Sequence, residues 1–272
     1  MSLPSRVRFL YIGDIMGAAG LELIESELPK LRQKRKIDFV IAQAENVSNG
    51  RGCTIGDFDR LMAAGVDFCT GGNWTLHQKD IYPYLEDPSK PIVRPANYPQ
   101  STPGLGYKYV KTTFGKILII SVLGQTVGRD SNLSLNNPLK TIDSILEKEE
   151  HAAKAATIIN FHGDYSSEKV VIGHYLNGRA TAVIGDHWHV PTADARILDK
   201  GTAHVSDVGM VGALNASLGV RTDVIIERWR DGKTSPNVLD SNRPWQFNAL
   251  FFEVDPRTAK AIHCEHIHLV YE

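Results

Sequence analysis

The segment VRFLYIGD, residues 7–14, is a mainly apolar run that ends in Gly13-Asp14. A short apolar run bounded by turn residues is typical of a strand that is buried on both faces. The amphipathic segment AAGLELIESELPKLRQKRK (18–36) follows it, and DFVIAQAEN (38–46) then repeats the strand pattern. Strand, helix and strand in this rhythm predict parallel pairing with a right-handed crossover.

The rest of the chain continues this alternation, with Thr54 as a predicted helix N-cap. The further predicted elements are a helix at 54–65, a strand at 66–73, a hairpin at 107–124 turning near Phe114-Gly115, a helix at 138–155, a strand at 156–164, a helix at 166–178, a strand at 180–187, and a hairpin at 246–270 around Asp255-Pro256. Taken alone, this order predicts one doubly wound α/β sheet. No repeat or long linker divides the chain, so we expect a single domain over residues 1–272.

The composition excludes several classes of protein. A chain of 272 residues with 42% hydrophobic content can bury a large core. Its 30 Lys and Arg against 31 Asp and Glu leave a net charge of -1, which gives no strong electrostatic sign of a nucleic-acid partner. The three cysteines lack CxxC spacing, and no apolar run is long enough for a signal peptide or a membrane span. We therefore expect a cytoplasmic globular protein with no membrane partner.

Polar side chains follow five of the predicted strands at the point where each strand ends. These exits are Gly13-Asp14, Glu45-Asn46, Asn73-Trp74, His162-Gly163-Asp164 and Asp186-His187-Trp188-His189. Loops at the carboxyl ends of strands collect active residues, because the strands hold them at one edge. If the exits share one edge, the carboxylates, amides and imidazoles converge.

Such a set of side chains is suited to binding metal ions. Carboxylate oxygens and imidazole nitrogens suit Mn, Fe or Zn, and a carboxylate such as Glu45 can bridge two ions. His187 and His189, two residues apart in an extended chain, would point the same way. Any one exit taken alone is explained better by a helix cap, a turn or a buried core histidine than by a metal ligand. Five exits in succession favour the metal site.

Two other motifs do not predict a binding site. The glycines of GDIMGAAG (13–20) follow GxxxGxxG spacing instead of the GxGxxG of dinucleotide-binding proteins. The C-terminal AIHCEHIHLV carries His263, His266 and His268 in a predicted edge hairpin. We interpret these histidines as solvent-facing polar alternation and not as a second metal site.

Six segments together resemble the YmdB-like branch of the calcineurin-type metallophosphoesterases. They are GDIMG (13–17), AENVSNGRGCT (44–54), GGNWT (71–75), INFHGDYSSEK (159–169), AVIGDHWHVPTADARIL (182–198) and VSDVGM (205–210). Their order and spacing match the family from about residue 8 to about residue 212, which is most of the chain. The resemblance implies a layered β-sandwich core flanked by helices.

The resemblance also implies a chemistry and a set of ligands. The activity would be hydrolysis of 2′,3′-cyclic nucleotides or similar phosphodiesters by a metal-bridging hydroxide, in a family that often forms homo-oligomers. The two metals would be Fe or Mn, with Zn as an alternative. The residues carried over are Asp14 and His189 on one metal, Glu45 as the bridge, Asn73, His162 and His187 on the other metal, and Asn46 on the substrate phosphate.

The chain departs from the family at Trp74, where the family carries the histidine expected to protonate the leaving group. An indole N–H does not release its proton at neutral pH. Three interpretations stay open. The protein is an active phosphodiesterase that uses another acid, for which His77 is the candidate; or it is a catalytically weak, metal-loaded nucleotide-binding or regulatory protein; or Trp74 only packs at the rim. Asp186 also replaces the small polar residue usual before the next histidine.

Overall fold

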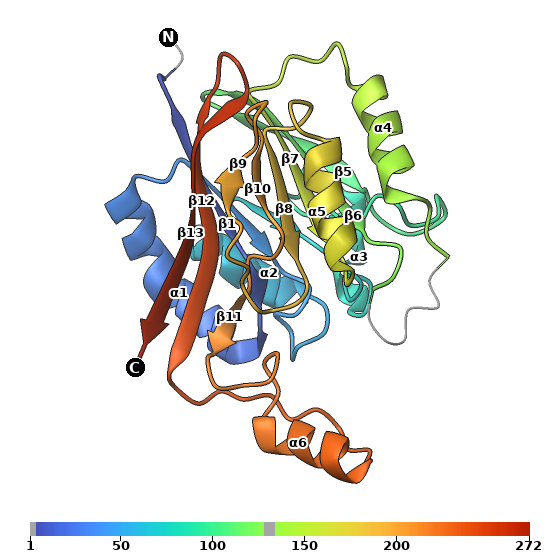
Figure 1. Ribbon diagram of the computed structural model, residues 1–272, viewed down its shortest axis with the longest axis vertical. Helices are drawn as coiled ribbons and strands as arrows, with labels where there is room; N and C mark the ends of the chain where they lie inside the picture. The colour runs from blue at the N-terminus through green and yellow to red at the C-terminus, as the bar shows by residue number, and fades with distance from the viewer. Residues whose placement is uncertain (1–3, 128–133) are drawn as a thin grey trace.

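The computed structural model describes residues 4–127 and 134–272, and its strands form two sheets that pack face to face (Figure 1). The first sheet contains, in spatial order, β2 (Asp14–Ile15), β11 (Met210–Ala213), β12 (Trp245–Asp255), β1 (Val7–Ile12), β3 (Phe39–Gln43) and β4 (Phe68–Thr70), with β13 (Lys260–Tyr271) paired to β12. The second sheet contains β5 (Tyr107–Thr112), β6 (Gly115–Leu123), β7 (Ala156–His162), β8 (Ala182–Asp186), β10 (Ala203–Val205) and β9 (Arg196–Ile197).

The helices cover the outer faces of this sandwich, except for the last one, which projects from one end (Figure 1). They are α1 (Gly17–Arg35), α2 (Ile55–Ala63), the 3-10 turn η1 (Lys79–Ile81), α3 (Tyr82–Glu86), α4 (Pro138–Lys148), α5 (Ser166–Tyr175) and α6 (Thr222–Asp231). Helices α1 and α2 share a buried cluster with the first sheet, and α4 and α5 share one with the second sheet. Among the described residues, no helix has both the length and the apolar character needed to cross a membrane.

The layered sandwich implied by the family resemblance is confirmed, and the single doubly wound sheet is wrong. Strand β12 pairs antiparallel with β13 along one edge and with β1 and β11 along the other, so the C-terminal hairpin completes the first sheet. Strands β5 to β10 pair only among themselves in the part of the chain that the structure describes. The alternation of strands and helices predicts where strands lie but not their partners, because both sheets contain parallel β–α–β units.

Aromatic packing between the two sheets forms the centre of the core. Alternate residues of β1 face opposite ways, so Phe9 and Tyr11 face the second sheet while Leu10 and Ile12 face the helices. The Phe9 ring stacks on Phe252, with centroids 5.1 Å apart. This division explains why the strand is apolar on both faces.

Several local predictions are confirmed. The two hairpins turn at residues 113–114 and 256–259, and the Thr54 side chain caps α2 by accepting a hydrogen bond from the Asp57 backbone. Among the C-terminal histidines, His263 and His268 are exposed as expected. His266 is half-buried instead, and its Nε2 donates a hydrogen bond of 2.8 Å to the Val208 carbonyl.

We expect Phe9→Ala to lower the free energy of unfolding by about 3–5 kcal/mol, since it removes a fully buried ring and leaves a cavity between the sheets. Chemical denaturation measures this change. Val270→Ala, at a 45% exposed position on β13, is the matched control and should change stability by less than about 0.5 kcal/mol. Equal effects of the two substitutions would contradict the assigned core.

Candidate metal centre

The five polar strand exits meet at one end of the sandwich. The exits of β1, β3 and β4 belong to the first sheet, and those of β7 and β8 belong to the second. Their side chains nevertheless come within hydrogen-bond distance of one another across the two sheets. The convergence expected from the sequence therefore occurs, although at the shared end of two sheets instead of one edge.

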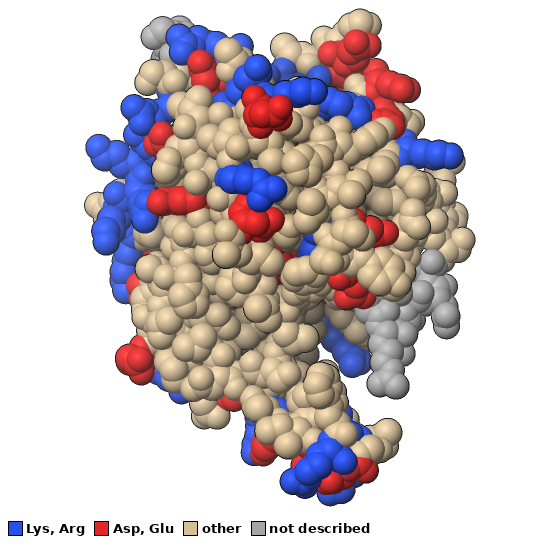
Figure 2. Space-filling view, in the orientation of Figure 1, with Lys and Arg blue, Asp and Glu red and all other residues tan. Residues whose placement is uncertain are grey.

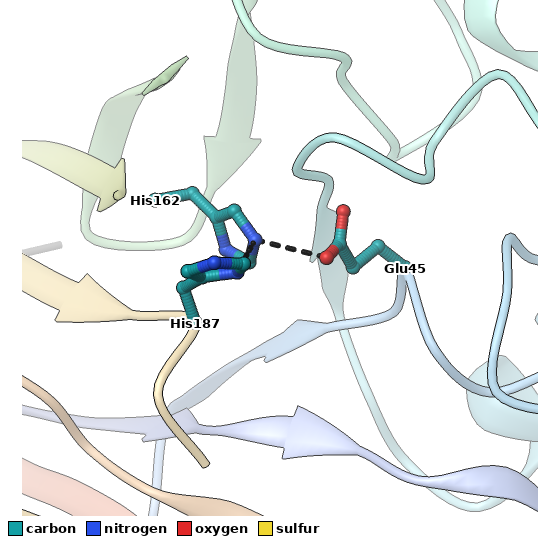
Figure 3. A group of neighbouring side chains, drawn as sticks. All are labelled: Glu45, His162 and His187. Carbon is teal, nitrogen blue, oxygen red and sulfur yellow. Dashed lines mark hydrogen bonds and ion pairs between the residues drawn. The ribbon is translucent and has the colours of Figure 1, made fainter. Parts of the chain in front are cut away.

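Three of the expected ligand atoms surround the Nε2 atom of His162. Glu45 Oε1 lies 2.9 Å from it, Asn73 Oδ1 3.0 Å and His187 Nδ1 2.8 Å. Figure 3 shows Glu45 and the two imidazoles pointing toward one another from separate elements. One carboxylate and two imidazoles whose ligand atoms all lie within 4.8 Å of one another could hold a metal ion.

Asp14 and His189 form a second group beside the first. His189 Nε2 lies 3.8 Å from Asp14 Oδ1, while the other Asp14 oxygen accepts a hydrogen bond of 3.1 Å from the His187 backbone. Asp14 Oδ1, His189 Nδ1 and Asn46 Oδ1 are buried and lack a hydrogen-bond partner among the described residues. A buried polar atom without a partner costs about 1–3 kcal/mol. The unpartnered carboxylate oxygen and imidazole nitrogen are therefore suited to binding a cation.

The electrostatics of the site reflect several buried ionisable groups held close together. Burial opposes charge on His162, but the Glu45 and Asp186 carboxylates raise the pKa of that imidazole well above its usual range. Burial, followed by the neighbouring Asp186, raises the pKa of Asp14. Burial and the nearby His187 lower the pKa of His189 to about 4, so this ring is neutral at neutral pH. A neutral imidazole is the form that binds metal.

Asp186 orients the central histidine. Its Oδ1 accepts a 2.7 Å hydrogen bond from His162 Nδ1, which leaves Nε2 of the same ring facing the ligand group. Its Oδ2 accepts from Tyr11 at 2.7 Å, from Asn160 at 2.7 Å and from Gln43 at 3.1 Å. Carboxylates in this position hold metal-binding histidines in the required tautomer. In the sequence, Asp186 is part of a strand exit and a departure from the family, and this orienting role was not predicted from it.

A second carboxylate orients the second histidine in the same way. Asp164 Oδ1 lies 2.9 Å from His187 Nε2, on the side of the ring away from the ligand group. Asp164 was found in the sequence as part of a strand exit but was given no role there. The sequence feature that could have indicated this role is the position of Asp164, two residues after His162 at the end of β7.

The expectation that His187 and His189 lie in an extended chain is wrong. Strand β8 ends at Asp186, and the two histidines have left-handed backbone angles, with φ of 105° and 62°. Such conformations cost about 1–3 kcal/mol each for residues other than glycine. They send the two rings to different ligand groups, His187 toward His162 and His189 toward Asp14.

A buried ion pair holds this strained loop in place. Lys169 and Asp207 are both fully buried, 2.9 Å apart. The same Asp207 oxygen accepts from the Trp188 backbone at 2.9 Å, and Lys169 also donates to the carbonyl of Asp186. Lys169 and Asp207 belong to the family segments INFHGDYSSEK and VSDVGM. No role was predicted for either residue, and the ion pair gives both of them one.

Gly72 allows the chain to pass close to the ligands. A Cβ atom at this position would lie 2.4 Å from Glu45 Oε2 and 2.6 Å from the His162 ring. Any larger residue would push these two side chains apart. The glycine before Asn73 is therefore needed for a close approach, and not for a left-handed turn.

Trp74 lies beside the ligands, whereas His77 does not. The Trp74 backbone donates to Glu45 Oε2 at 2.8 Å, and the Arg51 guanidinium covers its ring at 4.6 Å. The His77 ring meets the Trp74 ring edge-on, with centroids 5.5 Å apart, and His77 lies in a turn. The His77 side chain is exposed and is not among the residues that line the cavity at the ligands.

This cavity has a volume of about 540 Å³ and extends from the ligand groups to helix α6. Glu45, Asn46, His187 and His189 line it at one end, and Arg228 and Trp229 of α6 line it at the other. A cavity of this size can hold a small organic ligand.

Comparisons with known proteins agree with this geometry. Residues 10–267 match the family model described as YmdB-like protein. A 2′,3′-cyclic-nucleotide 2′-phosphodiesterase from Bacillus subtilis is 36% identical over 263 residues, which cover 96% of each chain.

Solved structures show the same fold. A novel phosphatase from Mycoplasma pneumoniae superposes with a TM-score of 0.90 at 32% identity, covering 97% of this chain and 94% of that one. A 5′-nucleotidase from Candida albicans superposes with a TM-score of 0.57 at 13% identity, covering 100% of this chain and 52% of that one. The second likeness concerns the fold alone.

We expect Asp186→Asn to weaken binding of Mn²⁺ or Zn²⁺ by about 10- to 100-fold, because the amide no longer holds His162 with Nε2 toward the metal. A competition titration with a chelator measures this affinity, on protein whose folded state is verified by circular dichroism. Tyr11→Phe removes one hydrogen bond to the same carboxylate and is the control, with a smaller loss expected. An unchanged metal affinity in Asp186→Asn would show that Asp186 does not orient His162 for metal binding.

Proposed function

Because the chain belongs to the YmdB-like protein family, we propose that it is a metal-dependent hydrolase of phosphoric diesters. The substrate class that we propose is the 2′,3′-cyclic nucleotides or similar phosphodiesters, in line with the name of the Bacillus subtilis relative. We propose further that residues 1–272 form one metallophosphoesterase domain, which works in the cytoplasm. The homo-oligomer implied by the family resemblance stays a prediction.

The observation that supports this proposal most directly is the pair of adjoining ligand groups with buried, unpartnered atoms. In the proposed centre, Asp14 and His189 hold one ion. Asn73, His162 and His187 hold the other, and Glu45 lies between them. Oxygen and nitrogen ligands of this kind suit Mn or Fe, and Zn also accepts them. When bound, two such ions supply positive charge to a phosphodiester and activate water for attack.

The chain's own residues contribute binding and orientation. Asn46 lines the cavity, and its Nδ2 donates to the Gly50 carbonyl at 2.9 Å. An amide nitrogen carries two N–H groups, so the second is available to a phosphate oxygen of the substrate. Asp186 and Asp164 hold the two central imidazoles with one nitrogen toward the ligand groups.

Hydrolysis of an unactivated phosphodiester requires a proton donor to the leaving oxygen. Trp74 occupies the position of the family's acid, and an indole cannot act as one. His77 is exposed and does not line the cavity, so we infer that it can replace this acid only if the turn moves. A second candidate function is therefore a metal-loaded nucleotide-binding protein with weak turnover, favoured by the Trp74 ring at the cavity wall.

A leaving-group comparison tests the proposal and separates the two candidates. Metal-loaded protein should hydrolyse bis(p-nitrophenyl) phosphate, whose leaving group needs no acid, better than 2′,3′-cyclic AMP, whose alkoxide does. Trp74→His should raise kcat for the cyclic nucleotide by up to about 10²–10⁴-fold and change the activated diester little.

His77→Ala is the companion variant. If it abolishes turnover of the cyclic nucleotide while the activated diester is unaffected, His77 is the acid after all. No hydrolysis of either substrate by metal-loaded wild-type protein or by Trp74→His would overturn the phosphodiesterase proposal.

We also expect bound metal to stabilise the fold. A ligand present at 100 times its Kd stabilises a native protein by about 2.7 kcal/mol, so removing the metal with a chelator should lower Tm. Differential scanning calorimetry measures this increment. His189→Ala removes one ligand of the Asp14 group and should reduce the metal-dependent increment in Tm. The same increment in both proteins would exclude His189 as a ligand.

A further inference from the structure

Between β11 and β12 the chain leaves the sandwich as an arm, defined here as residues 214–240. Helix α6 forms its outer part and projects from the lower end of the molecule (Figure 1). Figure 2 shows the same arm as a separate lobe below the body. No residue of α6 is buried.

The base of the arm is fixed against the metal centre. Val220 forms an isolated β-bridge with Leu239, and the backbone N–H of Asp240 donates a hydrogen bond of 2.9 Å to the Gly219 carbonyl. Gly219 has a φ of +84°, and a Cβ atom there would lie 2.1 Å from the Met16 side chain. Met16 is two residues beyond Asp14. This close packing holds the arm at the rim of the ligand groups.

One face of α6 is directed at the cavity. Ile225, Arg228 and Trp229 line it together with Glu45 and His189. Their spacing of three and four residues places them on the same side of the helix. Trp229 is 88% exposed, and none of the ring or cation contacts among the described residues involves it. A large exposed indole at the end of a ligand cavity is suited to stacking on a planar group.

Arg228, next to it, is held in a fixed orientation but has no carboxylate partner among the described residues. Its Nη1 donates to Asn237 Oδ1 at 2.7 Å and its Nε to Ser235 Oγ at 3.2 Å, and Nη2 donates to the Ser235 carbonyl. A guanidinium has five N–H groups, so two remain for an anion. An oriented arginine of this kind suits a phosphate group.

The indoles nearer the ligands differ from Trp229. Trp74 has Arg51 over its ring at 4.6 Å, and Trp188 has Lys169 over its ring at 4.8 Å. A cation already occupies one face of each of these rings. Trp229 is therefore the open stacking surface of the cavity, and it lies on a different segment from the ligands.

We propose that the arm is a nucleobase subsite, in which Trp229 stacks on the base of the nucleotide next to the one held at the metal centre and Arg228 contacts its phosphate. The preferred substrate is then the cyclic-phosphate end of a short oligoribonucleotide, and not a free mononucleotide. This inference rests on the proposed phosphodiesterase function. A subsite for one stacked base does not require a basic surface, so it is compatible with a net charge of -1.

Catalytic efficiencies on two matched substrates test the subsite. The substrates are adenosine 2′,3′-cyclic phosphate and the dinucleotide ApA with a terminal 2′,3′-cyclic phosphate. Base stacking on an aromatic side chain is worth about 5- to 150-fold in affinity. Wild-type protein should prefer the dinucleotide in kcat/KM by about this factor, and Trp229→Ala should remove the preference. Ile226→Ala, at an exposed apolar position of α6 that is not in the cavity lining, is the matched control and should keep it.

A binding measurement keeps this test independent of hydrolysis. Calorimetry with metal-loaded protein compares the affinity of ApA 3′-phosphate with that of 3′-AMP. Tighter binding of the dinucleotide, lost in Trp229→Ala, supports the subsite even if no substrate is hydrolysed. Equal affinities in wild-type protein overturn it, even if cyclic AMP is hydrolysed. Sedimentation gives a further outcome. If Trp229→Ala changes the oligomeric state but keeps the dinucleotide preference, Trp229 contacts a second copy of the chain, and the subsite proposal is overturned.

Discussion

The buried carboxylate of Asp186 is the group on which the arrangement of the site depends. It accepts hydrogen bonds from Tyr11 and Gln43 of the first sheet and from Asn160 and His162 of the second. One side chain thus joins the two layers at the end where the ligands gather. A buried carboxylate is stable only when its lone pairs are satisfied. That requirement links the relative position of the sheets to the orientation of the central imidazole.

The cost of this arrangement is concentrated at the same end of the molecule. Burial, followed by the nearby Asp186 carboxylate, raises the pKa of Asp14. Two histidines have left-handed backbone conformations, and a buried Lys169–Asp207 pair holds their loop. Strain, like-charge repulsion and unpartnered atoms are each unfavourable in a folded chain. Their accumulation at one place is typical of a functional site, since the rest of the core is conventional aromatic and aliphatic packing.

Much of the candidate site could be predicted from the sequence, because the candidate metal-binding residues follow strands. Asp14, Glu45, Asn73 and His162 each come at or directly after an apolar run, and the structure brings them together. What the sequence analysis missed acts through contacts between distant segments. Asp207 reaches the loop after β8 from a position 19 residues further along the chain. No local pattern around Asp207 indicates that partner, because the contact exists only once β8 and β10 lie side by side.

By itself, the sequence determined most of the strands and helices, the two hairpins and the polar strand exits, because these follow from local periodicity and from the residues that end each strand. Strands β9, β10 and β11 and helix α6 were not predicted. Only the tertiary structure decided that the strands form two sheets, because pairing depends on long-range contacts. It also decided that His187 and His189 turn apart, and that Trp229 of α6 shares a cavity with Glu45. These last features depend on residues far apart in the chain, and no periodicity records such distances.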